Sequence, residues 1–294
     1  MTKRKVEKLY TTYLRTSQYF YRGYIQRLWA RYDVPELGRI AQSMRLDAMP
    51  NATVDEEASA ETQAGVVKSC HATLLHLGDL SRYRHKMRQK LHGSETALTY
   101  YSLAQDLNPD SGFAHHQMGV IYLEEKNHLE IVYHFYRAWA VRAPHPNATN
   151  NLEVEFKTLL NPSTPGKRTG PPDPNAAFIS WFVRLHARFF KGETFPEHGE
   201  LEEEVLHRFE TSLKTPGTFR LLLKMVLVNI SAYYVAQAKI KSKRIPAHST
   251  LPLLTTYQKN GRILGRPRAN SSFVSMYALF WSSAACLNQN FAIL

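Results

Sequence analysis

Two stretches of this chain, Tyr101-Ser-Leu-Ala-Gln-Asp-Leu-Asn-Pro109 and Phe135-Tyr-Arg-Ala-Trp-Ala-Val-Arg-Ala-Pro144, repeat one pattern of residue types. Each copy has an aromatic residue, an alanine three positions later, and a proline that closes the stretch. The matched residues are Tyr101, Ala104 and Pro109 in the first copy and Phe135, Ala138 and, one residue late, Pro144 in the second. The pattern predicts two similar helices, each followed by a turn.

A spacing of 34 residues separates Tyr101 from Phe135, and this is the period of the tetratricopeptide repeat, whose unit is a pair of antiparallel helices. The first helix of each pair needs a small residue where its neighbour approaches closely. Gly78 and Gly119 stand at that place upstream of the two copies. Stacked helix pairs share a core and usually present a binding surface. The sequence therefore predicts an all-α array, similar to tetratricopeptide repeats, that binds a partner.

Helical periodicity and breaks in composition predict four parts. An antiparallel helical array occupies residues 1–160, a Pro- and Gly-rich linker follows at 161–175, and a further α-helical hairpin domain covers 176–250. A basic and then apolar tail at 251–294 receives no predicted fold. Within the hairpin domain, residues 219–238 are apolar nearly all round, which predicts a helix buried on every side.

Charge is distributed unevenly along the chain, whose net charge is +12 over 294 residues. Residues 1–31 hold eight Lys or Arg against one acid, Glu7, and no Asp or Glu follows Glu210. Such asymmetry indicates a polyanionic partner, either nucleic acid or phosphorylated protein. The alternative is a set of basic helices whose cations are simply solvated. The chain has only two cysteines and no export signal at its start, which favours a reducing compartment.

Sequence patterns for catalysis and metal binding are missing. No two histidines have the i, i+4 spacing of a helical zinc site, and neither a glycine-rich phosphate loop nor a nucleophile elbow is present. We therefore expect no enzymatic activity, no metal and no cofactor. The apolar run near the carboxyl end is shorter than the roughly 20 residues that span a bilayer, so we expect no membrane partner.

The string His76-Leu-Gly-Asp-Leu-Ser-Arg-Tyr-Arg84 closely resembles the signature of the ever-shorter-telomere (Est1/SMG) family, the telomerase-regulatory and nonsense-mediated mRNA decay factors with a 14-3-3-like amino-terminal domain. Further matching strings, at residues 21–26, 135–140 and 181–186, extend the resemblance over roughly residues 3–243. It implies a 14-3-3-like layer of paired helices, here expected to lack the family's first helices, joined to a further helical domain. We expect a fungal source.

By this resemblance, Arg82 is the residue that contacts phosphate in family members that bind phosphopeptides. A guanidinium offers a rigid fork of donors to two phosphate oxygens. Tyr83 can add a hydroxyl donor, and Lys86, one helical turn further on, can add a second cation. Three alternatives stay open: Arg82 forms an exposed pair with Asp79 that a phosphate could displace, Tyr83 is a packing residue, and Lys86 is solvated.

Two functions follow from the resemblance. The first is a non-catalytic adaptor of nonsense-mediated mRNA decay that binds a phosphorylated RNA helicase of that pathway. The second is a subunit of the telomerase ribonucleoprotein that binds telomerase RNA or telomeric single-stranded DNA. For either function we expect a nuclear and cytoplasmic protein that can form a hetero-oligomer with a related family member.

Overall fold

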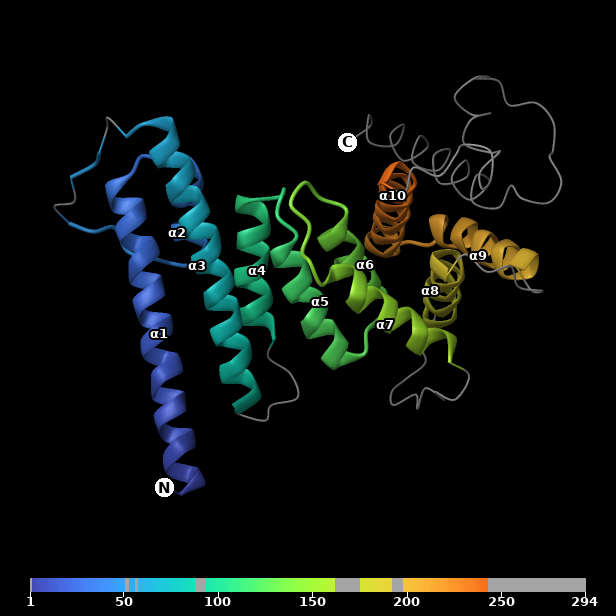
Figure 1. Cartoon of the computed structure of the whole chain (residues 1–294), viewed down its shortest axis with the longest axis horizontal. Helices are drawn as coiled ribbons and strands as arrows, with labels where there is room; N and C mark the ends of the chain where they lie inside the picture. The colour runs from blue at the N-terminus through green and yellow to red at the C-terminus, as the bar shows by residue number, and fades with distance from the viewer. Residues whose placement is uncertain are drawn as a thin grey trace. The chain divides into compact units, whose positions relative to one another are not determined.

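The computed structural model describes residues 2–50, 53–55, 58–87, 94–161, 175–191 and 198–242, with side chains up to residue 235. These residues form ten α-helices and no β-strand (Figure 1). The helices are α1 Lys3–Arg31, α2 Pro35–Ser43, α3 Ala60–Met87, α4 Glu95–Leu107, α5 Phe113–Glu125, α6 His128–Trp139, α7 Ala148–Leu160, α8 Ala176–Lys191, α9 His198–Leu213 and α10 Phe219–Ser242. The predicted all-α fold is confirmed.

The chain divides into two compact units. The first unit contains Met1–Lys126 and Arg137–Ala148, and the second contains Asn127–Tyr136 and Thr149–Leu294. This division falls inside α6, earlier in the chain than the boundary expected near residue 160. The expected linker lies mostly, and the expected tail wholly, outside the described residues, so the domain boundaries drawn from the sequence stay predictions.

In the first unit, α1 and α3 lie side by side and run antiparallel (Figure 1). Three contacts show that the helices are antiparallel, because each later residue of α1 contacts an earlier residue of α3. These contacts are Gln18 with Ser81, Tyr21 with His76, and Tyr24 with Ser69. Helix α1 ends before Pro35, which holds the preceding Val34 in an extended conformation and occupies the first turn of α2.

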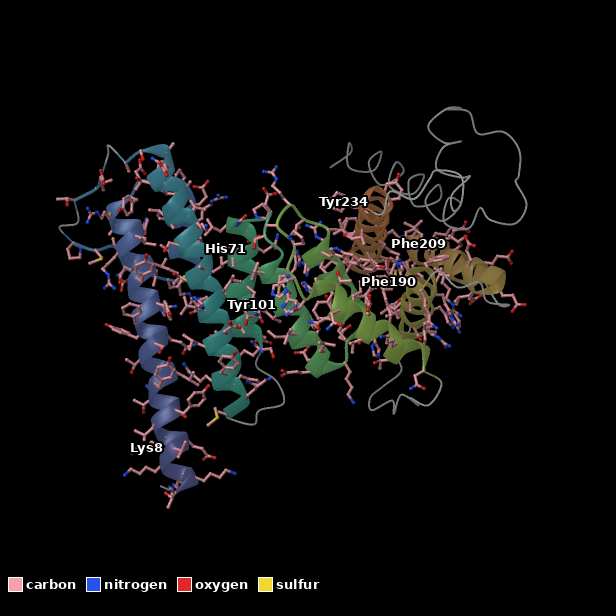
Figure 2. All side chains as sticks on the ribbon, in the orientation of Figure 1. Lys8, His71, Tyr101, Phe190, Phe209 and Tyr234 are labelled. Atoms are coloured by element: carbon pink, nitrogen blue, oxygen red, sulfur yellow. The ribbon has the colours of Figure 1, made fainter. Side chains whose placement is uncertain are left out.

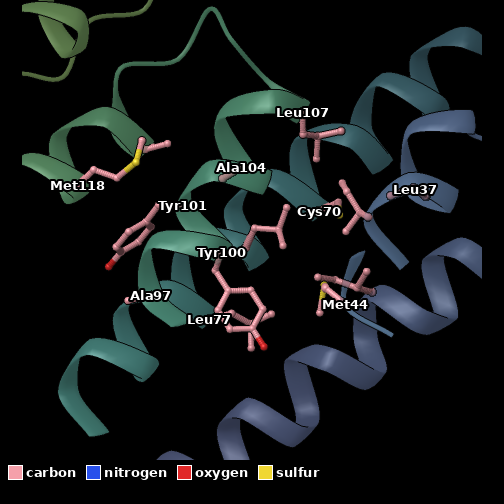
Figure 3. Close-up of a cluster of buried hydrophobic side chains, with 14 of the residues drawn as sticks. Leu37, Met44, Cys70, Leu77, Ala97, Tyr100, Tyr101, Ala104, Leu107 and Met118 are labelled. Atoms are coloured by element: carbon pink, nitrogen blue, oxygen red, sulfur yellow. The ribbon is translucent and has the colours of Figure 1, made fainter. Parts of the chain in front are cut away.

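A buried apolar cluster joins α1 to α5 in the first unit (Figure 3). Leu74 and Leu77 of α3 and Tyr101 and Ala104 of α4 have no exposed surface. The ring of Tyr101 packs so closely on Gly78 that a Cβ atom built there would lie 2.2 Å from the ring. Gly78 therefore has the small-residue role that the repeat pattern predicts, and α4 lies directly against α3 at this point.

The other repeat residues occupy buried positions, except for the two prolines. Phe135 and Ala138 have no exposed surface, and Gly119 lies among the buried residues of α5. Pro109, in the turn after α4, and Pro144, after α6, are both exposed. The next glycine, Gly112, touches the carbonyl oxygen of Ala138, because a Cβ atom built there would lie 2.1 Å from it. The α4–α5 turn thus packs on the carboxyl end of α6.

The second unit has an aromatic core. Phe178 and Phe182 of α8 are buried, and the Phe178 ring packs against Phe209 of α9. Buried His186 shares a hydrogen bond of 2.7 Å with Asn229 of α10. Among the described helices, none combines the length and the apolar composition that a bilayer-spanning segment needs.

Helix α10 departs from the prediction of burial on every side. Its apolar side chains are partly exposed along one face, at Phe219, Leu223, Ile230 and Tyr234, while Met225 and Val228 on another face are buried. The prediction was wrong because composition gives the apolar content of a helix and not the number of neighbours that cover it.

Candidate anion-binding site

Arg82 lies on α3 and is largely buried, with 12% of its side chain exposed. Its Nη2 atom donates to Asp79 Oδ1 at 2.9 Å and makes a longer contact of 3.4 Å with Gln117 Oε1 of α5. Its Nε atom is buried and has no hydrogen-bond partner among the described residues. The expectation of an exposed Arg82–Asp79 pair is therefore half right, since the pair forms but is not exposed.

The packing of α4 explains this burial. Tyr101 sits on Gly78, and its hydroxyl donates to Asp79 Oδ1 at 2.7 Å, so Asp79 is shared by two helices. Burial opposes the charge of Arg82, but the hydrogen bond and charge of Asp79 outweigh it and raise the pKa of the guanidinium. Breaking a buried pair costs more than breaking an exposed one. A phosphate would therefore have to displace a partner that the fold holds in place.

Tyr83 and Lys86 also have partners within the first unit. The Arg82 guanidinium carbon lies 4.9 Å from the centre of the Tyr83 ring, and Tyr83 is 39% exposed. Lys86 Nζ lies 2.5 Å from Glu124 Oε1 of α5, and both side chains are about half exposed. Arg82, Tyr83 and Lys86 lie on one stretch of α3. The two cations among them, Arg82 and Lys86, each pair with a carboxylate. Their role in phosphate binding stays a prediction.

A second cluster of positively charged side chains lies between α1 and α3. A hollow of about 520 Å³ is lined by Thr12, Arg15, Thr16, Gln18, Tyr19 and Arg22 of α1 and by Arg84 of α3. Three of these seven side chains are guanidinium groups, and no Asp or Glu lines the hollow. An electropositive concavity of this kind favours an anion.

The three arginines of the hollow differ from Arg82 in their partners, which are neutral or missing. Arg84 Nη1 donates to Gln18 Oε1 at 2.8 Å. Arg22 donates to the Tyr100 hydroxyl at 3.1 Å and to the Met44 carbonyl at 2.8 Å. Arg15 is exposed and has no hydrogen bond or ion pair with the described residues. Three arginines therefore line this hollow, and none of them forms an ion pair with a carboxylate of the described residues.

Sequence reasoning missed this hollow, although part of the signal is visible. Thr12, Arg15, Tyr19 and Arg22 follow one another at spacings of three, four and three residues, and Thr16 lies four residues after Thr12, which places them on one side of a helix. The sequence analysis counted the cations of residues 1–31 but did not assign them to one face of the helix. Arg84 could not be joined to this face from the sequence, because the pairing of α1 with α3 is a tertiary contact.

Metal ligands do not gather in the described part of the chain, where no three His, Cys, Asp or Glu side chains lie close enough to hold an ion. The expected absence of a metal or cofactor from the whole chain stays a prediction.

Two family models match the chain in succession. The model described as telomerase activating protein Est1 matches residues 1–88, and the model described as the Est1 DNA/RNA binding domain matches residues 97–288, more than half of the chain. This chain belongs to the Est1 family. The second match extends beyond residue 243, so the resemblance drawn from sequence strings ended too early.

Curated relatives carry names from both branches of the family. The nonsense-mediated mRNA decay factor SMG7 of Arabidopsis thaliana is 31% identical over 150 residues, which cover 50% of this chain and 14% of that protein. The telomere elongation protein est1 of Schizosaccharomyces pombe is 23% identical over 158 residues, which cover 51% of this chain and 32% of that protein. The chain thus matches a third or less of each relative's length. Relatives from a plant and a fungus leave the fungal source a prediction.

A solved structure has the same fold. In a crystal structure of Est1 and Cdc13, one chain matches 95% of this chain and 54% of its own length, with a TM-score of 0.64 and 14% sequence identity. At that identity the likeness concerns the fold alone. The predicted family and helical architecture are both confirmed.

Proposed function

We propose that this Est1-family chain is a non-catalytic adaptor of nonsense-mediated mRNA decay whose first unit binds phosphorylated protein segments. The partner we propose is a phosphorylated RNA helicase of that pathway, in the nucleus and the cytoplasm. The name of the Arabidopsis relative, a decay factor, supports the pathway.

One observation carries the binding role. Helix α1 holds eight Lys or Arg, and none of them forms an ion pair with the described residues. Its one acid is Glu7, and Lys8 lies near the amino-terminal end of the helix (Figure 2). Cations that balance no internal carboxylate are available to an external anion, which they attract over about a Debye length of 10 Å at 0.1 M salt.

The test compares three probes on the full chain by fluorescence anisotropy. These are phosphoserine peptides with degenerate flanks, the same peptides without phosphate, and a short single-stranded RNA. We expect the phosphorylated peptides to bind about tenfold or more tightly than the unphosphorylated ones. Equal binding of the two peptide pools would contradict the proposal.

Arg82→Ala belongs in the same series, with a melting curve for the variant. Because Arg82 holds Asp79 inside the fold, a loss of binding counts as evidence for a phosphate contact only if the melting temperature is kept.

A second candidate is a telomerase-associated subunit that binds telomerase RNA or telomeric single-stranded DNA. The observation that favours it is the match of residues 97–288 to a model described as a DNA/RNA binding domain. Nucleic-acid binding falls steeply with salt, because each neutralised phosphate releases counterions. Strong RNA binding with a steep salt dependence, and no preference for phosphopeptide, would favour this candidate.

A further inference from the structure

We propose that the hollow between α1 and α3 is the phosphate site of the adaptor, and that Arg15, Arg22 and Arg84 together bind a phosphate monoester on a protein segment. This inference rests on the proposed function and assigns it a site. It moves the anion from Arg82, whose charge Asp79 balances, to three guanidiniums that no carboxylate balances.

Charge decides between the two classes of phosphate ligand. A phosphoserine carries −1.5 to −2 charges at neutral pH, whereas each phosphodiester of RNA or DNA carries one. Three arginines line one hollow of about 520 Å³, so their positive charge is gathered within one site, which suits a dianion. A nucleic-acid backbone is better matched by cations spread along a track, so the hollow favours a phosphorylated side chain.

Hydrogen bonds from neighbouring residues fix the positions of two of the three guanidiniums. Gln18 is the positioning residue for Arg84, because its Oε1 accepts from Arg84 while its Nε2 donates to Ser81 Oγ at 2.9 Å. Ser81 in turn donates to the Leu77 carbonyl, so this arrangement is anchored in α3 itself. Arg22 is fixed by Tyr100 and the Met44 carbonyl.

The remaining groups can complete the contact with the ligand. Arg15 is exposed and is free of internal partners among the described residues, so it can close over a bound phosphate without losing a bond. The Thr16 hydroxyl also has no described partner and offers a further donor. Tyr19, 83% exposed at the same hollow, can contact the residues that flank the phosphoserine.

The test uses two charge-removing variants and a matched control in the full chain. Arg15→Gln and Arg84→Gln each remove one cation from the hollow, and Arg27→Gln removes one exposed cation of α1 that does not line it. We expect each hollow variant to weaken binding of the phosphoserine peptides about tenfold, and Arg27→Gln to weaken it less than about twofold. Inorganic phosphate should compete with the peptides on the wild-type protein, and Arg15→Gln should weaken that competition.

The outcomes separate this inference from the function on which it rests. If the wild-type protein prefers phosphopeptide but the hollow variants bind like Arg27→Gln, the site assignment is wrong and the adaptor function stands. If the wild-type protein shows no preference for phosphate, the function itself is wrong. If Arg15→Gln and Arg84→Gln lose RNA as strongly as phosphopeptide, the hollow is a nucleic-acid site and the monoester assignment is overturned.

Discussion

At the scale of single residues, Gly78 controls the environment of Arg82. The missing side chain at Gly78 admits the Tyr101 ring, the Tyr101 hydroxyl reaches Asp79, and Asp79 holds Arg82. Burial, with the neighbouring Asp79 carboxylate, raises the pKa of the Tyr101 phenol, so this hydroxyl stays a donor at any ordinary pH. Residues 76–84, which carry the family resemblance, thus also form the contact of α3 with α4.

Gly78→Ala should destabilise the first unit by about 1 to 3 kcal/mol, because its Cβ would lie 2.2 Å from the buried Tyr101 ring and force the helices apart. Gly65→Ala is the matched control on the same helix. It has nothing within 4 Å of the new Cβ and should be neutral or stabilising by up to about 1 kcal/mol. Urea unfolding monitored by circular dichroism measures both, and equal effects of the two changes would refute the close-packing argument.

At the scale of elements, the turn between α4 and α5 is tied to the segment that follows α6. The Gly112 N–H donates to the Ala143 carbonyl and the Ala143 N–H to the Asp110 carbonyl, both at 2.9 Å. The His145 N–H donates to the Ala138 carbonyl at 3.0 Å. Backbone bonds of this kind fix residues 140–145, which contain no helix, to the repeat array.

Gly112→Ala tests this connection. Its Cβ would lie 2.1 Å from the Ala138 carbonyl oxygen and 2.8 Å from the His145 nitrogen, and backbone atoms cannot rotate away as a side chain can. The φ angle at Gly112 is −78°, so the effect is steric and not conformational. We expect a loss of about 3 kcal/mol or more, with faster hydrogen exchange at the Gly112 and Ala143 amides. Unchanged exchange at these amides would show that the turn does not depend on this contact.

At the scale of the whole molecule, both units contain buried histidines that the fold keeps neutral. Burial lowers the pKa of His115 to about 3, with a further contribution from the charge of Arg137. Burial, His145 and Arg82 lower that of His116 to about 4. In the second unit, burial lowers the pKa of His186 to about 4, although its hydrogen bond to Asn229 acts in the opposite direction. Each imidazole is therefore neutral in the folded protein at a pH where it would be protonated in the unfolded chain.

Stability should therefore fall as the pH drops. The pKa of each histidine in the folded protein lies below its unfolded value of 6.5. Its contribution to the free energy of unfolding is therefore complete above pH 6.5 and is lost progressively as the pH falls to the folded pKa, near 4 for His186 and near 3 for His115. Within that window each histidine should contribute a slope of up to about 1.4 kcal/mol per pH unit. His186→Gln, which cannot titrate, should flatten the curve by one such contribution. Urea unfolding at several pH values between 7 and 4 measures this, and identical slopes for variant and wild type would contradict it.

The fold could be predicted further from the sequence than the site. The 34-residue spacing and the string around Arg82 identified helix pairs and the family, because both are local patterns that helical geometry imposes. The burial of Arg82 could not be predicted, since it depends on Tyr101, which lies on another helix, and on Gln117 on a third. The exposed stripe of α10 was missed for the same reason, because burial is a property of neighbours.

The sequence by itself determined the helices, their order, the family and the excess of cations, because each of these follows from residue type and spacing along one chain. Tertiary structure alone decided which cations are balanced. It buried the Arg82–Asp79 pair beneath Tyr101, brought Glu124 to Lys86, and joined Arg84 to Arg15 and Arg22 around a hollow without a carboxylate. The physical reason is that electrostatic balance depends on distance in space, and the contacts that α1, α4 and α5 make with α3 set those distances.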